Sequence, residues 1–134
     1  MKDDLGHALT VRRDSSRHQC RACLRLTEPG DGFILLSHSP FASDQPYAEV
    51  GPIFIHDKEC RPYAKAEEYP EEFPRNAVVL RAYNERDEIE DAAFVGSRPV
   101  EEVIAGLFER PRVAYVHARN STYGCFMFRI DRAN

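Results

Sequence analysis

The stretch Val113-Ala-Tyr-Val-His-Ala-Arg119, followed by Asn120-Ser-Thr-Tyr-Gly124 and Cys125-Phe-Met-Phe-Arg-Ile-Asp131, decides the fold at the C-terminal end of the chain. Two strand-like segments joined by five residues that end in glycine are typical of a β-hairpin. Side chains along a strand alternate between its two faces. This alternation predicts one face with Phe126, Phe128 and Ile130 and an opposite face with Cys125, Met127 and Arg129.

A helix is predicted directly before this hairpin, over about residues 98–110. Ser97 is suited to cap the helix, Pro99 is tolerated in its first turn, and Pro111 ends it. The apolar residues with helical spacing are Val100, Val103, Ile104, Leu107 and Phe108.

The rest of the chain indicates several short strands separated by turns and proline-containing loops. The sequence therefore predicts an α+β fold with a mainly antiparallel sheet, the C-terminal hairpin and one clear helix. We expect a single domain over residues 1–134, in which residues 1–7 form a loose terminus. The segments that we expect to form strands are residues 8–13, 33–36, 53–55, 77–83 and 88–95.

Composition limits the classes of function. The chain has 134 residues, of which 43% are hydrophobic and 30% charged, and its formal net charge is −4. This mildly acidic balance argues against a general nucleic-acid binder, which should carry a basic surface. No apolar run approaches the roughly 20 residues of a membrane span. The N-terminal residues lack the apolar core of a secretory signal, so we expect a cytoplasmic protein with no membrane partner.

Two pairs of metal-binding side chains form the strongest chemical signal in the sequence. Cys20 and Cys23 make a Cys-x2-Cys pair, and His56 and Cys60 make a His-x3-Cys pair. Zinc prefers four such ligands in a tetrahedron. A Cys3His shell leaves no coordination position for water, so we expect a structural zinc site that staples the N-terminal segment.

The order of elements resembles a zinc knuckle, a hairpin and a helix start, as in a treble-clef finger. Residues 57–69 are expected to begin a helix, with Cys60 near its N-terminus. The knuckle lacks the glycine that often follows the second cysteine, since Leu24 stands there. Two alternatives stay open: small buried thiols beside a surface histidine, or a redox pair at Cys20 and Cys23.

His117 and Cys125 form the second candidate site. If Arg119 pairs with Cys125, then His117 faces Met127 across the hairpin and lies diagonal to Cys125. A cysteine beside a histidine can act as an activated nucleophile, although the two can equally fill a sheet face. If His117 is functional rather than packed, His117→Ala should change stability by less than about 1 kcal/mol. A further alternative is a small basic face for an anionic ligand, made by Arg119, Arg129 and His117.

Several segments of the chain together carry a resemblance to a known family. They are Cys20-Arg-Ala-Cys-Leu24, Glu28-Pro-Gly-Asp31, Gln45-Pro-Tyr-Ala-Glu-Val-Gly-Pro-Ile-Phe54, Leu80-Arg-Ala-Tyr83, Val113-Ala-Tyr-Val-His-Ala-Arg-Asn120, Gly124-Cys-Phe126 and Arg129-Ile-Asp-Arg132. These segments resemble a bacterial family known as domain of unknown function 1203, over about residues 19–132, and that family carries no assigned activity. The resemblance implies that a function common to the family lies at the terminal hairpin, at His117, Asn120 and Cys125, with Tyr47 and Arg21 at the rim of a pocket there.

Two hypotheses about function follow. The first is a zinc-stabilised binding or structural module, with a face near His117 for an unknown small molecule or protein. The second is an enzyme that uses Cys125 and His117 for acyl or thiol chemistry. The residues expected to contact a ligand are His117, Arg119, Asn120, Tyr47 and Arg21.

Overall fold

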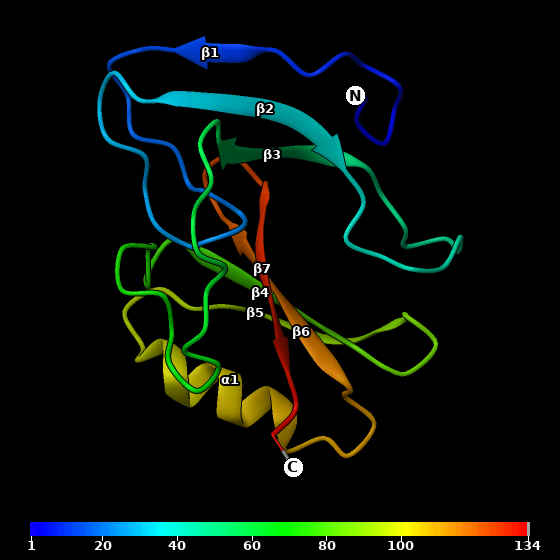
Figure 1. Cartoon of the computed structure of the whole chain (residues 1–134). Coiled ribbons are helices and arrows are strands. Elements are labelled where there is room, and N and C mark those ends of the chain that lie inside the picture. Colours follow the sequence, from blue (N-terminus) through cyan, green and yellow to red (C-terminus); the bar gives the residue numbers. More distant parts are fainter. Residues whose placement is uncertain (134) are drawn as a thin grey trace. The chain divides into compact units, whose positions relative to one another are not determined.

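The computed structural model describes residues 1–133, which are arranged in two compact units (Figure 1). Residues 1–39 and 50–73 make up the first unit, and residues 40–49 and those from Pro74 onward make up the second. Both sheets are antiparallel, and the described residues contain one α-helix. None of the described residues form a helix that is long and apolar enough to cross a membrane.

The first unit is built on a three-stranded sheet in the order β1-β2-β3, formed by β1 (Val11–Arg13), β2 (Gly32–His38) and β3 (Gly51–His56). The strand expectations for residues 33–36 and 53–55 are confirmed, and both strands extend further. Phe33 near the start of β2 pairs with His56 at the end of β3. This register holds His56 at a fixed place on the sheet.

Asp3 fastens the N-terminal residues to this sheet. Its carboxylate accepts hydrogen bonds from the backbone N–H groups of Leu5 and His7, at 3.0 and 2.8 Å, and from that of Ser37 at 2.9 Å. Ser37 belongs to β2, so a single carboxylate joins the first residues of the chain to a strand.

The prediction that a helix begins in residues 57–69 is wrong. The segment after β3 consists of bends, turns and irregular backbone. Pro62 explains the difference, because it has no N–H to donate and it biases Arg61 toward an extended conformation. Cys60 therefore lies on irregular chain, and no helix dipole acts on its thiol.

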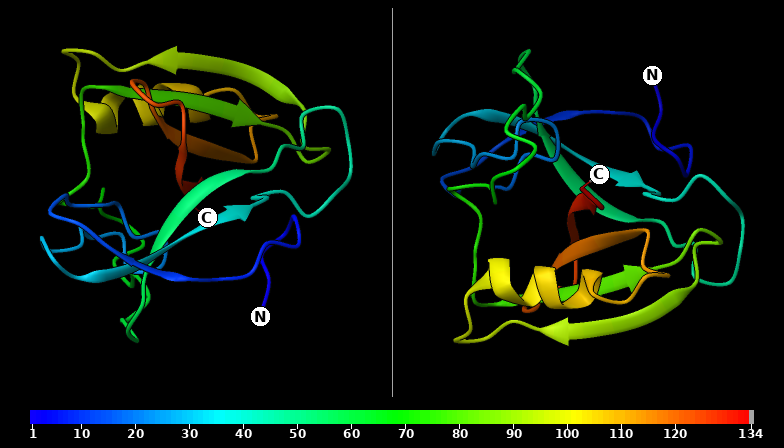
Figure 2. Two further views of the ribbon diagram at one scale, coloured as in Figure 1. Left: turned by 90° about the horizontal axis from the view of Figure 1, so that it is seen from above. Right: turned by 90° about the horizontal axis from the view of Figure 1, so that it is seen from below.

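The second unit carries a four-stranded sheet in the order β5-β4-β6-β7 and the helix α1 (Val100–Phe108) (Figure 2). Its strands are β4 (Val78–Tyr83), β5 (Ile89–Phe94), β6 (Tyr115–Asn120) and β7 (Phe126–Asp131). The predicted hairpin and helix are both confirmed. Ser97 does not cap α1, because Pro99 occupies the N-cap position, with no side-chain hydrogen bond to the helix.

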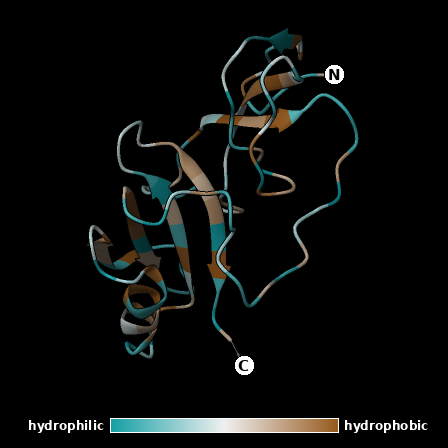
Figure 3. Ribbon diagram, turned by 90° about the vertical axis from the view of Figure 1, so that its left-hand side faces the viewer, coloured by the Kyte–Doolittle hydropathy of each residue, from teal (hydrophilic) through white to brown (hydrophobic). Residues whose placement is uncertain are grey.

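The core of the second unit lies on one face of the β4–β6 pair. Val78, Leu80 and Ala82 of β4 are fully buried, and so are Val116 and Ala118 of β6. Phe128 pairs with Ala118 and is 5% exposed, and α1 buries three apolar side chains of its own. Figure 3 shows hydrophobic residues along the strands and hydrophilic residues in most of the connections.

A β-bulge at the tip of the hairpin changes the predicted faces of β7. Ala118 pairs with Phe128, but Arg119 pairs with Phe126, so Met127 has no partner position on β6. An extra residue of this kind reverses the alternation beyond it. The prediction that Phe126 shares a face with Phe128 is therefore wrong. His117 pairs with Arg129, and the prediction that it faces Met127 is wrong as well.

Candidate functional site

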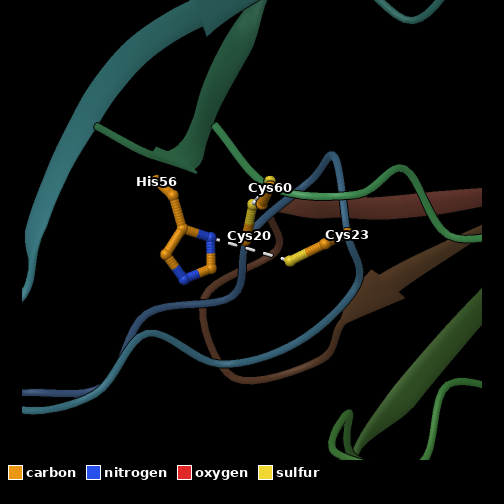
Figure 4. A group of neighbouring side chains, drawn as sticks. All are labelled: Cys20, Cys23, His56 and Cys60. Atoms are coloured by element: carbon orange, nitrogen blue, oxygen red, sulfur yellow. Dashed lines mark hydrogen bonds between the residues drawn. The ribbon is translucent and has the colours of Figure 1, made fainter. Parts of the chain in front are cut away.

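The four predicted metal ligands converge in the first unit. One ligand atom from each of Cys20, Cys23, His56 and Cys60 lies within 4.8 Å of the others (Figure 4). Cys20 is held against β3 by an isolated bridge to Phe54, and His56 is the last residue of that strand. The sheet thus positions the first cysteine and the histidine, whereas Cys23 lies on the turn that follows Cys20 and Cys60 lies on irregular chain after β3.

The knuckle between the two cysteines is a tight turn. The N–H of Leu24 donates to the carbonyl oxygen of Cys20 at 3.0 Å, and the N–H of Cys20 donates to the carbonyl oxygen of Arg25 at 2.9 Å. Leu24 has a φ of 56°, a left-handed conformation that costs roughly 1–2 kcal/mol for a residue with a Cβ. The turn therefore takes the shape that usually favours glycine, although the sequence has leucine there.

Two of the distances between ligand atoms are close to the edge length of a zinc tetrahedron. The sulfurs of Cys20 and Cys60 are 3.9 Å apart, and the Cys23 sulfur lies 3.6 Å from His56 Nδ1. Zinc–sulfur bonds of about 2.3 Å and zinc–nitrogen bonds of about 2.0 Å place neighbouring ligands of a tetrahedron roughly 3.5–3.8 Å apart. A disulfide would need about 2.05 Å between sulfurs, and all four cysteines are free. The geometry suits a metal held through Nδ1.

The pKa values of the cysteine thiols in the cluster also favour a bound cation. Burial alone would raise the pKa of the Cys20 thiol, but hydrogen bonds from the backbone N–H groups of Cys23 and His56 lower it to about 7. Burial and the charges of Cys20 and Cys23 raise the pKa of Cys60 to about 12. Three thiolates therefore cannot coexist here at neutral pH unless a positive charge lies among them. A divalent metal ion bound by these residues would supply that charge.

A cavity of about 770 Å³ borders the cluster within the first unit. Cys23, His56 and Cys60 contribute to its wall, together with residues of the irregular segment that follows β3. This opening gives a metal ion a path from solvent to the ligands, which a bound site requires.

His117, the centre of the predicted ligand face, is fully buried in the second unit. Its ring lies among four aromatic rings, with centroid distances of 5.0 Å to Phe41, 4.9 Å to Tyr83, 5.1 Å to Tyr115 and 4.8 Å to Phe126. Because β6 alternates, this aromatic face lies on the side of the sheet opposite Val116 and Ala118.

This packing changes the expected effect of removing His117. We expect His117→Ala to lower the free energy of unfolding by about 2–4 kcal/mol, because truncation leaves a cavity among the four rings. The comparison is His7→Ala, which removes the same side chain at a position that is 66% exposed. Urea denaturation of both variants measures the difference. Equally small losses would mean that the aromatic face tolerates an empty space.

The other predicted ligand residues have separate surroundings. Asn120 Oδ1 accepts hydrogen bonds from the backbone N–H groups of Thr122 and Tyr123, so this oxygen is already engaged in the hairpin turn. The Cys125 thiol is partly exposed and reaches the Tyr123 carbonyl oxygen at 3.9 Å. Asn120 therefore shapes the turn that carries Cys125.

The two residues predicted for the rim belong to different units. Arg21 lies in the first unit beside Cys20, and its backbone N–H donates to the carbonyl oxygen of Phe54 at 2.8 Å. Burial lowers the pKa of its guanidinium, and the neighbouring Cys20 sulfur opposes that shift. Tyr47 lies in the second unit and is 44% exposed.

Sequence reasoning missed two charged residues on the aromatic face, Arg81 and Glu49. Arg119, which was predicted, forms an ion pair with Glu49, and Arg81 approaches the same Glu49 oxygen at 3.3 Å. Both missed residues lie in segments that carry the family resemblance, Gln45–Phe54 and Leu80–Tyr83. That resemblance was the one signal that could have found them, because no local spacing connects the two segments.

Comparison with known proteins places the chain in a family. A family model described as "Protein of unknown function (DUF1203)" matches residues 17–132, so the chain belongs to this family. The match covers most of the chain and agrees with the resemblance seen in the sequence. No curated protein and no solved structure shows a significant match to the chain.

Proposed function

We propose that the protein is a zinc-stabilised binding module. One zinc ion, held by Cys20, Cys23, His56 and Cys60, fixes the first unit, and the aromatic face around His117 in the second unit receives a small ligand or a protein partner. The observation that carries the metal part is the convergence of three sulfurs and one imidazole nitrogen within 4.8 Å. Four soft ligands and no further carboxylate in the group favour zinc over a hard cation.

Zinc would add a direct link between Cys60 and the rest of the first unit, beside the backbone hydrogen bond from the Tyr63 N–H to the Ala22 carbonyl oxygen at 3.1 Å. The knuckle and the end of β3 are linked by backbone hydrogen bonds, but Cys60 lies on irregular chain. A metal bound at this point ties that chain to the sheet, and its binding free energy contributes to folding. The aromatic face would then be the part of the protein that meets other molecules.

We also propose that the protein is located in the cytoplasm, and the support for this is again its cysteines. A site with three thiolate ligands needs reduced cysteines, and the cytoplasm keeps thiols reduced. All four cysteines of the chain are free, including Cys125 outside the cluster.

Metal analysis of the purified protein tests the proposal. We expect about one zinc ion per chain, released by a strong chelator, with a lower melting temperature after release. Cobalt added in place of zinc should give the visible absorption of a tetrahedral thiolate complex. A metal-free protein that melts at the same temperature with and without added zinc would contradict the proposal.

A further inference from the structure

We propose that the aromatic face of the second unit is a binding site for a small oxyanion, and that Glu49 occupies this site as an internal stand-in. The ligand class is a small molecule with a carboxylate or phosphate group, which would replace the Glu49 carboxylate between Arg81 and Arg119. This inference rests on the binding-module function proposed above and names the ligand that the module would take.

The two arginines converge from neighbouring strands. Arg81 of β4 pairs with His117 of β6, and Arg119 follows His117 by two residues on the same face. Diagonal neighbours of this kind lie within reach of long side chains. Both guanidinium groups contact Glu49 Oε1, Arg81 through Nη1 at 3.3 Å and Arg119 through Nη2. One carboxylate oxygen therefore lies between two positive charges.

Arg119 is buried much more than an ordinary surface arginine. Its side chain is only 10% exposed, whereas that of Glu49 is 42% exposed. Taking a guanidinium out of water is costly unless its donors are matched by acceptors. Arg119 Nη1 donates to the Gly124 carbonyl oxygen at 2.9 Å, but its Nε is buried and makes no hydrogen bond within the described chain.

A second buried donor lies on the same face. The Tyr83 hydroxyl is buried and finds no acceptor for its O–H among residues 1–133, although the Arg81 guanidinium is close enough to donate to its oxygen. Burial raises its pKa, and the neighbouring Arg81 guanidinium acts in the opposite direction, which places the hydroxyl beside that charge. Buried donors without acceptors are uncommon in folded proteins and point to a missing acceptor. An anion with several oxygens supplies more acceptors than the one Glu49 oxygen that is engaged.

Glu49 is also placed so that its carboxylate can move away from the two arginines. It lies at the end of residues 40–49, which form neither helix nor strand. The same segment is held further back by Phe41, which packs on His117, and by Ser43, which donates to Asp87 at 2.5 Å. Moving the Glu49 carboxylate into water therefore leaves these contacts in place. The same movement would expose the two arginines to an incoming anion, and bidentate contacts between arginine and a carboxylate or phosphate are favourable.

Glu49→Gln tests the proposal, because it removes the internal charge and nearly keeps the shape. Titration calorimetry with inorganic phosphate and with succinate compares the variant with the wild-type protein. We expect Glu49→Gln to bind at least one probe about tenfold more tightly, which corresponds to roughly 1.4 kcal/mol. The probe that gains more identifies the preferred group. Adding Arg81→Ala to Glu49→Gln should abolish the gain.

Glu85→Gln is the matched control. Glu85 is an exposed residue of the same unit, and the same change there should leave binding unaltered. A folded Glu49→Gln protein that binds neither probe would overturn the inference. Glu49 would then serve only to hold residues 40–49 in place. If Glu49→Gln does not fold, Glu49→Asp withdraws the carboxylate by one methylene, and the absence of any gain there is equally decisive.

Zinc content measured on the same samples separates the two proposals. Protein that carries zinc but gains no anion affinity in Glu49→Gln would refute the anion site alone. Wild-type protein without zinc would refute the metal centre whatever the titrations give.

Discussion

Cys60→Ala is expected to abolish zinc binding and to lower the free energy of unfolding by at least about 3 kcal/mol, because structural zinc in small peptides contributes on the order of 10 kcal/mol. Cys60 is the most informative of the four ligands for this test. It lies on irregular chain and is only partly buried, so the loss of its side chain as packing should be small. A large loss of stability would therefore report the metal.

Cys125→Ala provides the control for that experiment. It is the same chemical change at a partly buried cysteine outside the metal cluster. We expect this variant to keep its zinc and to unfold close to the wild-type protein, with a loss of less than about 1 kcal/mol. Zinc content and urea denaturation should be measured on both variants. If Cys60→Ala retains zinc and matches Cys125→Ala in stability, the metal centre is refuted.

Phe128→Ala is expected to give the second large effect, a loss of about 3–5 kcal/mol, because the deleted ring leaves a cavity in the core. Phe128 is 5% exposed and pairs with the fully buried Ala118. Phe94→Ala makes the same change at a position that is 58% exposed, and we expect it to cost less than about 1.5 kcal/mol. Similar losses in the two variants would contradict the assignment of the core face.

The regular parts of the fold could be predicted because their signals are local. The hairpin at residues 113–131 shows strand alternation with a glycine-containing turn, and the helix shows apolar residues at helical spacing. The metal ligands could be predicted for a related reason, since both pairs are defined by short spacing. Their convergence needed no helix after His56, so the site survives although that helix is absent.

The aromatic face could not be predicted in detail because it depends on register and on distant contacts. The bulge that skips Met127 leaves no mark in the alternation of β7, yet it moves Phe126 to the face of His117. Glu49 and Arg81 are 32 residues apart in sequence, and only the folded sheet brings them together. The burial of His117 could not be predicted either, because histidine is a polar residue type and gave no sign that this side chain would be fully buried.

Each unit is formed by two segments that are separated in the sequence, and this affects the order in which the units can fold during synthesis. The chain passes between the two units at residues 39–40, 49–50 and 73–74, so neither unit is one continuous segment. A fragment that begins at Pro74 would lack Phe41, which packs on His117, and Glu49, which pairs with Arg119. During synthesis at about 5–20 residues per second, residues 40–49 leave the ribosome well before β6 and β7 exist. The second unit therefore cannot complete its folding until β6 and β7 have been synthesised, whereas the first unit can form earlier.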